Sequence, residues 1–186
     1  MSDKMQYDKK GVTFMRKPIA VATILALSLF AAPASADPVE RGYQAQTNAF
    51  KGKFLAGGGL FGQSIDDARG HKIMGEVVYV GRGCNNDAYL AEPAGKVAMV
   101  ERGACMFTEK VARAEKAGAI AVIVYNNVSA GDTVSAMAPP ANFNDTIGIP
   151  SALVGRTDGR AMVDAQGPVT VQVKDKTRDK LETREE

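Results

Sequence analysis

Few residues in this sequence could perform catalytic chemistry. His71 is the one histidine among 186 residues, so a Ser-His-Asp or Cys-His arrangement would have to be built on it. No Gly-x-Ser-x-Gly elbow, HExxH helix or GxxxxGK phosphate-binding loop occurs. The adjacent acids Asp66 and Asp67 point to different sides of the chain and are typical of a solvated face. We therefore expect a protein that is not an enzyme and needs no cofactor.

The two cysteines, Cys84 and Cys105, both follow a predicted export signal. An oxidising compartment permits a disulfide between them, and we expect them to be paired. A bridge that closes a loop of this size would contribute about 3 kcal/mol. The alternative is a metal pair, which lacks the third and fourth ligands that tetrahedral zinc requires, so no metal site is expected.

The export signal is predicted over residues 1–36. A basic stretch is followed by an apolar run over 19–32, too short to span a bilayer comfortably, and by small residues up to Ala36. Residues 1–14 precede a second candidate start at Met15, and an over-extended gene start would account for them. After cleavage we expect no stable membrane insertion and a periplasmic or extracellular location; an uncleaved anchor is the alternative.

The charge of the mature chain is close to neutral. Removal of the signal leaves 18 Lys and Arg against 19 Asp and Glu, whereas the full chain carries a formal net charge of +2. No basic stripe interleaved with aromatic residues is present. Nucleic acid is therefore not an expected partner.

The hydrophobic periodicity predicts a mixed α/β fold behind an irregular N-terminal segment, residues 37–72. Strands are predicted at 73–80, 96–100, 119–125, 149–154 and 169–173, and helices at 107–118 and 157–165. The strand, helix and strand between 96 and 125 predict a βαβ unit with parallel strands.

Details of these elements follow from single residues. Thr108 is expected to cap the first helix, Gly118 to end it and Lys110 to lie on its polar side, while Thr157 or Asp158 is expected near the cap of the second helix. Pro150 suggests an edge or early strand at 149–154. Residues 174–186 are predicted to be a solvated, charged tail.

The long segment without periodicity, residues 126–147, is predicted to be a functional loop. The candidate binding residues are Asn126, Asn127, Asp132, Met137, Asn142 and Asn144. Deletion of residues 130–143 is expected to abolish partner binding and to leave the melting temperature nearly unchanged. Glycosylation sequons begin at Asn127 and Asn144, but the bacterial type of the signal favours unmodified side chains.

The turn Glu101-Arg102-Gly103 has two interpretations. It could grip a ligand, or it could be fixed by an ion pair or backbone contact, which is the interpretation we favour. The methionines Met99, Met106 and Met137 are more typical of core or loop positions than of a soft-metal site.

Several spaced motifs occur in a fixed order along the chain. They are Gly83-Cys84, Gly95-Lys96-Val97, Glu101-Arg102-Gly103, Cys105, Phe107, Lys110-Val111, Ala114, Ala117-Gly118-Ala119, Tyr125-Asn126-Asn127 and Ile149-Pro150-Ser151. In this order residues 73–173 resemble the protease-associated (PA) domain. The resemblance implies a small, partly open β-barrel or sandwich flanked by short helices. It also implies a role in binding peptides or covering an active site without catalysis.

The leading hypothesis is a stand-alone, exported, non-catalytic interaction module. In the usual pattern of the family the domain is attached to a catalytic domain, and we expect this protein to depart from that pattern. It would present the 126–147 loop and the neighbouring strand end to a peptide or protein, such as an exported protease or its substrate. Two alternatives stay open. One is an auxiliary or remnant of an exported peptidase whose hydrolytic activity depends on His71. The other is a structural envelope protein that self-associates.

Overall fold

The computed structural model describes residues 42–128 and 131–176. The described residues all belong to one compact unit. The predicted signal peptide and residues 177–186 of the predicted tail lie outside the described residues.

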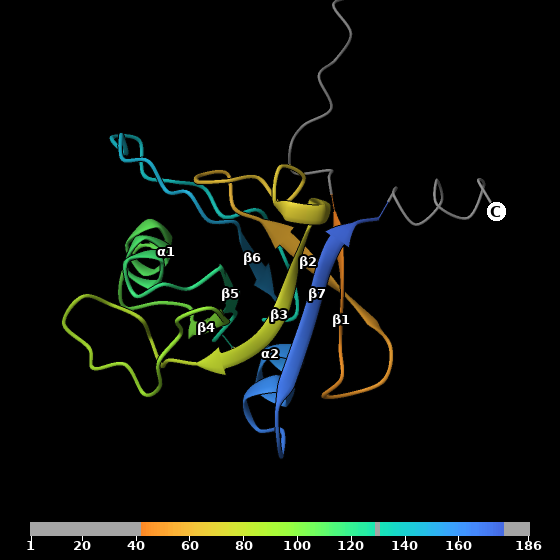
Figure 1. Ribbon diagram of the computed structural model, residues 1–186. Coiled ribbons are helices and arrows are strands. Elements are labelled where there is room, and N and C mark those ends of the chain that lie inside the picture. Colours follow the sequence, from red (N-terminus) through yellow and green to blue (C-terminus); the bar gives the residue numbers. More distant parts are fainter. Residues whose placement is uncertain (1–41, 129–130, 177–186) are drawn as a thin grey trace, which may run out of the picture. The chain divides into compact units, whose positions relative to one another are not determined.

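Strands in the described part form a closed barrel (Figure 1). In chain order they are β1 (Tyr43–Thr47), β2 (Lys53–Gly58), β3 (Lys72–Tyr79), β4 (Val97–Glu101), β5 (Ala121–Tyr125), β6 (Ser151–Val154) and β7 (Val169–Asp175). Around the barrel the order is β1-β2-β6-β5-β4-β3-β7, and the neighbours from β3 to β6 pair in parallel. The predicted α/β fold is confirmed, including the parallel pairing of β4 with β5, in which Val97 lies opposite Ala121.

Two α-helices pack against this barrel, α1 (Phe107–Lys116) and α2 (Arg156–Val163), and a short 3-10 turn, η2 (Arg69–His71), precedes β3. Helix α1 is not capped by Thr108, which lies inside the helix and is 6% exposed; its N-cap is Met106, without a side-chain cap. Gly118 ends the helix as predicted, because its φ of +81° is left-handed and its N–H donates to the carbonyl of Glu115 at 2.8 Å. Helix α2 begins at Arg156, after Gly155 as its N-cap.

Two apolar layers explain the continuous hydrophobic runs of β4 and β5. Alternate residues face opposite sides of a sheet, so Val97 and Met99 fill the barrel while Ala98 and Val100 pack beneath α1. Val111 of α1 is completely buried in this outer layer. The strands that carry the predicted βαβ unit are therefore covered on both faces.

The segment predicted to be irregular, residues 37–72, contains β1 and β2. The sequence was misleading because Gly57, Gly58 and Gly59 look like a turn. Here they allow close packing instead: a Cβ on Gly57 would lie 2.1 Å from the Ser135 carbonyl oxygen, and one on Gly58 would lie 2.7 Å from the Tyr43 ring.

The C-terminal strands also differ from the expectation. β6 is not an edge strand, because it pairs with β2 on one side and β5 on the other, and Pro150 lies just before it. β7 extends to Asp175, so the predicted tail begins two residues too early. Lys174 and Asp175 of β7 pair in antiparallel fashion with β1, which closes the barrel.

Candidate binding site at the carboxyl ends of the parallel strands

The parallel strands β4, β5 and β6 bring their carboxyl ends to one edge of the barrel. Glu101 lies opposite Tyr125, and Tyr125 lies opposite Val154. Loops that follow such ends converge, which is why ligand sites of α/β sheets so often lie there. The segments that start at Arg102, Asn126 and Gly155 therefore meet at this edge.

The turn after β4 is fixed by backbone contacts. The Arg102 N–H donates to the Tyr125 carbonyl at 2.9 Å, and the Glu101 N–H donates to the Gly81 carbonyl at 3.1 Å. Gly103 then turns the chain with a φ of +92°. Between Glu101 and Arg102 no ion pair is found in the described residues, so the turn is held by its backbone.

Arg102 is also held through its side chain. Its Nη1 donates to the Oδ1 of Asn126 at 3.0 Å, and its guanidinium lies 6.0 Å from the centre of the Phe107 ring. Asn126 is only 4% exposed, so the predicted binding residue is a buried support for Arg102. Asn127, in contrast, is exposed beside Gly103, where a Cβ would lie 3.1 Å from the Asn127 amide nitrogen.

Asp132 connects the predicted loop to helix α2. Its Oδ1 accepts a hydrogen bond from the Thr157 N–H at 2.8 Å, and its Oδ2 accepts one from the Thr157 hydroxyl at 2.8 Å. These two bonds hold the pKa of Asp132 below its usual value. Asp132 thus caps α2 from a distance in sequence, which replaces the cap expected from Thr157 or Asp158 themselves.

The other predicted binding residues lie elsewhere in the loop. Met137 is completely buried, and its backbone N–H and carbonyl bond Gly58 and Leu60 at 3.0 and 2.8 Å. Asn142 and Asn144 are exposed, and in the described residues no hydrogen bond joins them to Asn126 or Asn127. Because Met137 belongs to the outer core, the loop is a structural part of the domain and its deletion would not be neutral for stability.

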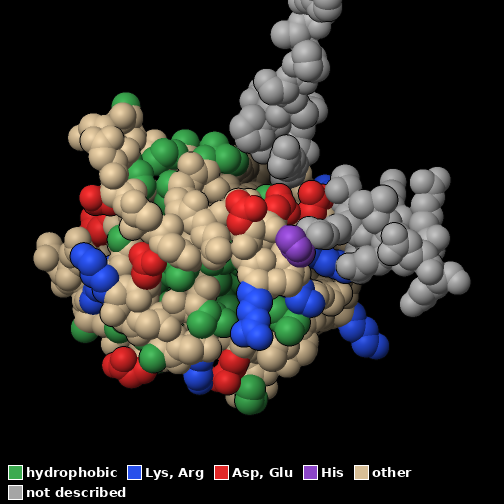
Figure 2. Space-filling view, turned by 45° about the horizontal axis from the view of Figure 1, so that its top comes forward, with side chains coloured by type: hydrophobic (Ala, Val, Ile, Leu, Met, Phe, Trp, Pro, Cys, Tyr) green, Lys and Arg blue, Asp and Glu red, His purple; other side chains and the backbone are tan. Residues whose placement is uncertain are grey.

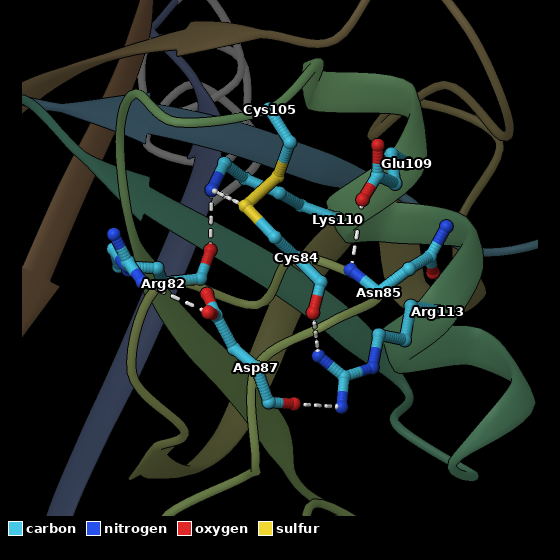
Figure 3. Close-up of a disulfide and its surroundings, with 8 residues drawn as sticks. All are labelled: Arg82, Cys84, Asn85, Asp87, Cys105, Glu109, Lys110 and Arg113. Atoms are coloured by element: carbon cyan, nitrogen blue, oxygen red, sulfur yellow. Dashed lines mark hydrogen bonds and ion pairs between the residues drawn. A yellow bond between two sulfur atoms is a disulfide. The ribbon is translucent and has the colours of Figure 1, made fainter.

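The disulfide between Cys84 and Cys105 forms as predicted (Figure 3). Helix α1 holds the loop around Cys84 through three further side chains. Arg113 donates to the carbonyls of Cys84 and Asp87, Glu109 accepts from the Asn85 N–H at 2.8 Å, and Lys110 donates to the Arg82 carbonyl.

The prediction that Lys110 lies on the polar side of the helix is wrong. Its side chain is 0% exposed. Its position, three residues after Phe107 and four before Ala114, was the signal for the apolar face. Burial lowers the pKa of the Lys110 amine.

Among the described residues, His71 is hydrogen-bonded to no nucleophile of the kind that a hydrolase uses. The side chain is exposed, and its Nδ1 is hydrogen-bonded to the backbone carbonyl of Asp66. Asp66 in turn accepts a hydrogen bond from the Tyr43 hydroxyl at 3.2 Å. Both cysteines of the chain are in the disulfide, so neither offers a thiolate to this histidine.

A separate groove of about 1030 Å³ lies beside the hairpin that joins β1 and β2. Its lining includes Lys51 of that hairpin, Met74 and Glu76 of β3, and Thr170 of β7. Met74 is 59% exposed there. This groove could not be predicted from the sequence, because more than half of its lining residues belong to the segment predicted to be irregular.

The surface of the domain is mixed in character. Acidic, basic and hydrophobic side chains all occur on the face seen in Figure 2. Among residues 42–128 and 131–176, neither helix has the length and apolar character needed to cross a bilayer.

Comparison with known families and proteins identifies a shared domain. A PA domain model matches residues 73–162. Leucine aminopeptidase 2 of Trichophyton rubrum is 39% identical over 109 residues, which are 54% of this chain and 20% of that protein. C5a peptidase of Streptococcus pyogenes is 34% identical over 89 residues, or 48% of this chain and 7% of that protein. The chain thus spans a fifth or less of the length of these relatives.

Solved structures show the same fold. A zinc aminopeptidase from Bacillus subtilis superimposes with a TM-score of 0.54 and 22% identity, over 73% of this chain and 31% of the enzyme. An aminopeptidase from Aneurinibacillus sp. strain AM-1 gives a TM-score of 0.51 and 25% identity, over 72% of this chain and 30% of that chain. These matches reach beyond residues 73–162, in agreement with the contribution of β1, β2 and β7 to the barrel.

Proposed function

Because residues 73–162 of this chain form a PA domain, we propose that the protein is an exported, non-catalytic module that binds an extended peptide or a partner protein. The proposed contact surface is the strand-end site, formed by Arg102, Asn127 and Val128 at the carboxyl ends of β4 and β5. Such domains occur in peptidases, and a partner that is an exported protease or its substrate would suit a module of this kind.

One observation carries the choice of the strand-end site. Arg102 is held by its own backbone and by Asn126, so its guanidinium is kept in one place next to exposed groups. Asn127 beside it is exposed, and Val128 is 46% exposed. A donor held in position and an exposed amide can hydrogen-bond the backbone of an extended peptide, and an exposed apolar side chain can contact one of its side chains.

The chemistry of the described residues supports a binding role over a hydrolytic one. His71 is hydrogen-bonded to a backbone carbonyl, and a histidine base needs a nucleophile within hydrogen-bond reach. The disulfide supports export, because such bridges persist in oxidising compartments.

The test is a synthetic peptide library probed with the purified protein and two pairs of variants. Asn127→Lys and Val128→Asp change the strand-end site, and the matched controls Asn142→Ala and Asn144→Ala change the distal part of the same loop. We expect the first pair to lower peptide affinity at least tenfold and the second pair to leave it within twofold. Equal loss in both pairs, or the absence of any bound peptide, would contradict the proposal.

The same library distinguishes binding from hydrolysis. Mass spectrometry of the peptides after incubation should show no cleavage. Cleavage that disappears in His71→Ala would establish the peptidase alternative instead.

A further inference from the structure

The loop between β3 and β4 is tied to α1 by side-chain hydrogen bonds as well as by the disulfide. Besides the disulfide, it is held by Arg113 at two carbonyls, by Glu109 at the Asn85 N–H and by Lys110 at the Arg82 carbonyl (Figure 3). These bonds do not depend on the bridge. Opening the disulfide would therefore leave the loop in place.

One of these ties is chemically unusual. Lys110 is 0% exposed, and its Nζ lies 3.5 Å from the Sγ of Cys84. In the described part of the chain no carboxylate lies within ion-pair distance of this amine. A buried ammonium without a paired anion is costly, and an apolar side chain of similar length would fill the same space without that cost.

A thiolate at Cys84 would supply the missing anion. When a disulfide opens, the sulfur that leaves does so as a thiolate, and it leaves faster when a cation stabilises it. The amine lies beside Cys84, which is 9% exposed, while Cys105 is more exposed. The structure is thus asymmetric: Cys84 is placed to leave and Cys105 to be attacked.

We propose that Cys84–Cys105 is a reversible thiol–disulfide exchange pair whose partner is a dithiol, with Lys110 as the positioning residue for the Cys84 thiolate. One thiolate of the dithiol attacks the Sγ of Cys105, the bond between the two cysteines breaks, and Cys84 leaves as a thiolate beside Lys110. The second thiol of the partner then displaces Cys105. The partner ends as a disulfide, and this protein ends with two reduced cysteines.

The Glu109 carboxylate lies within 4.8 Å of both sulfurs and disfavours both thiolates, so the Lys110 amine is the group that distinguishes Cys84 from Cys105. Other charged groups face the same amine and act on it in both directions. Asp87 and Glu109 from the loop and helix, and Glu101 from β4, favour its protonated form, whereas Arg82 disfavours it. Burial is the larger effect and lowers its pKa. An anion on Cys84 would favour the protonated form of the Lys110 amine, and the protonated amine would favour the Cys84 thiolate, so the two groups would titrate as a coupled pair.

The test measures each thiol in the reduced protein. Alkylation with iodoacetamide from pH 5 to 10, read by peptide mass spectrometry, gives a separate titration curve for each cysteine. We expect Cys84 to titrate at least one pH unit below Cys105, and Lys110→Met to raise only the Cys84 curve. In a dithiothreitol redox buffer at pH 8, Lys110→Met should make reduction about fivefold less favourable, or about 20 mV.

Arg113→Met is the matched control, because Arg113 also anchors this loop but is bonded to carbonyls. It should lower stability and leave both titration curves within about 0.3 pH units, which corresponds to a twofold change in an ionisation constant. Identical curves for the two cysteines in the wild type, or unfolding of the protein on reduction, would overturn the proposal. The wild-type curves decide the matter even if Lys110→Met does not fold.

Discussion

Met137 provides a direct test of whether the 126–147 segment is a free loop or part of the core. The side chain is 0% exposed and lies in the outer apolar layer together with Val124 and Leu153. Truncation to alanine removes three heavy atoms from a packed site, and such Met→Ala changes cost about 3 kcal/mol. For a domain of this size, about 4 °C per kcal/mol gives a fall of about 12 °C in Tm.

The assay is thermal and urea unfolding, followed by circular dichroism, with Met74→Ala and Met106→Ala as matched controls. Both control side chains are exposed, at 59% and 61%, so their truncation should change the unfolding free energy by less than about 0.5 kcal/mol. If Met137→Ala melts within about 2 °C of the wild type, the loop does not contribute to the core and our reasoning is wrong.

Three further predictions concern the same end of the barrel. Asp132→Asn should weaken the cap of α2. The pKa of Asp132 is lowered in the folded state, so its carboxylate stabilises the fold fully above the unfolded pKa of about 4. This stabilisation is lost as the pH falls through the folded pKa. Unfolding free energies from pH 3 to 6 should therefore converge for variant and wild type at the acid end, and a constant gap would contradict this. Burial raises the pKa of Tyr125, so stability should fall above about pH 10, where the unfolded phenol ionises first, and Tyr125→Phe should reduce that fall in alkaline unfolding curves. Gly159→Ala would place a Cβ 2.1 Å from the Cβ of Tyr125 and should cost about 3 kcal/mol in urea unfolding, whereas Ala161→Ser on the exposed side of α2 should cost less than about 0.5 kcal/mol.

The parts of the fold that could be predicted from the sequence are those with strong local periodicity. The apolar spacing of α1 and the β-branched run of β5 each specify one structure within a short window, and both are found. β1 and β2 could not be predicted in the same way. The glycines of β2 are required by contacts with Ser135 and with Tyr43 of β1, and a local pattern does not contain that information.

The candidate site divides in a similar way. The disulfide was predictable, since two cysteines in an exported chain have one pairing. The support of Arg102 by Asn126 and the capping of α2 by Asp132 were not, because each joins residues 24 or 25 positions apart. The sequence therefore identified polar residues near the strand ends but not which of them are structural.

This division matters for where a ligand could bind. Of the residues predicted for binding, Asn126 and Asp132 already use their side-chain oxygens within the domain, and Met137 fills the core. A ligand that bound the side-chain oxygens of Asn126 and Asp132 would have to break their hydrogen bonds to Arg102 and Thr157. The free energy of the lost hydrogen bonds would offset that of the new contacts. A ligand at Asn127 and Val128 meets no such cost, because both side chains are exposed and they directly follow Asn126, which holds the Arg102 guanidinium in position. Substitutions at these two exposed positions should therefore affect binding without affecting stability, whereas substitutions at the buried ones should affect both.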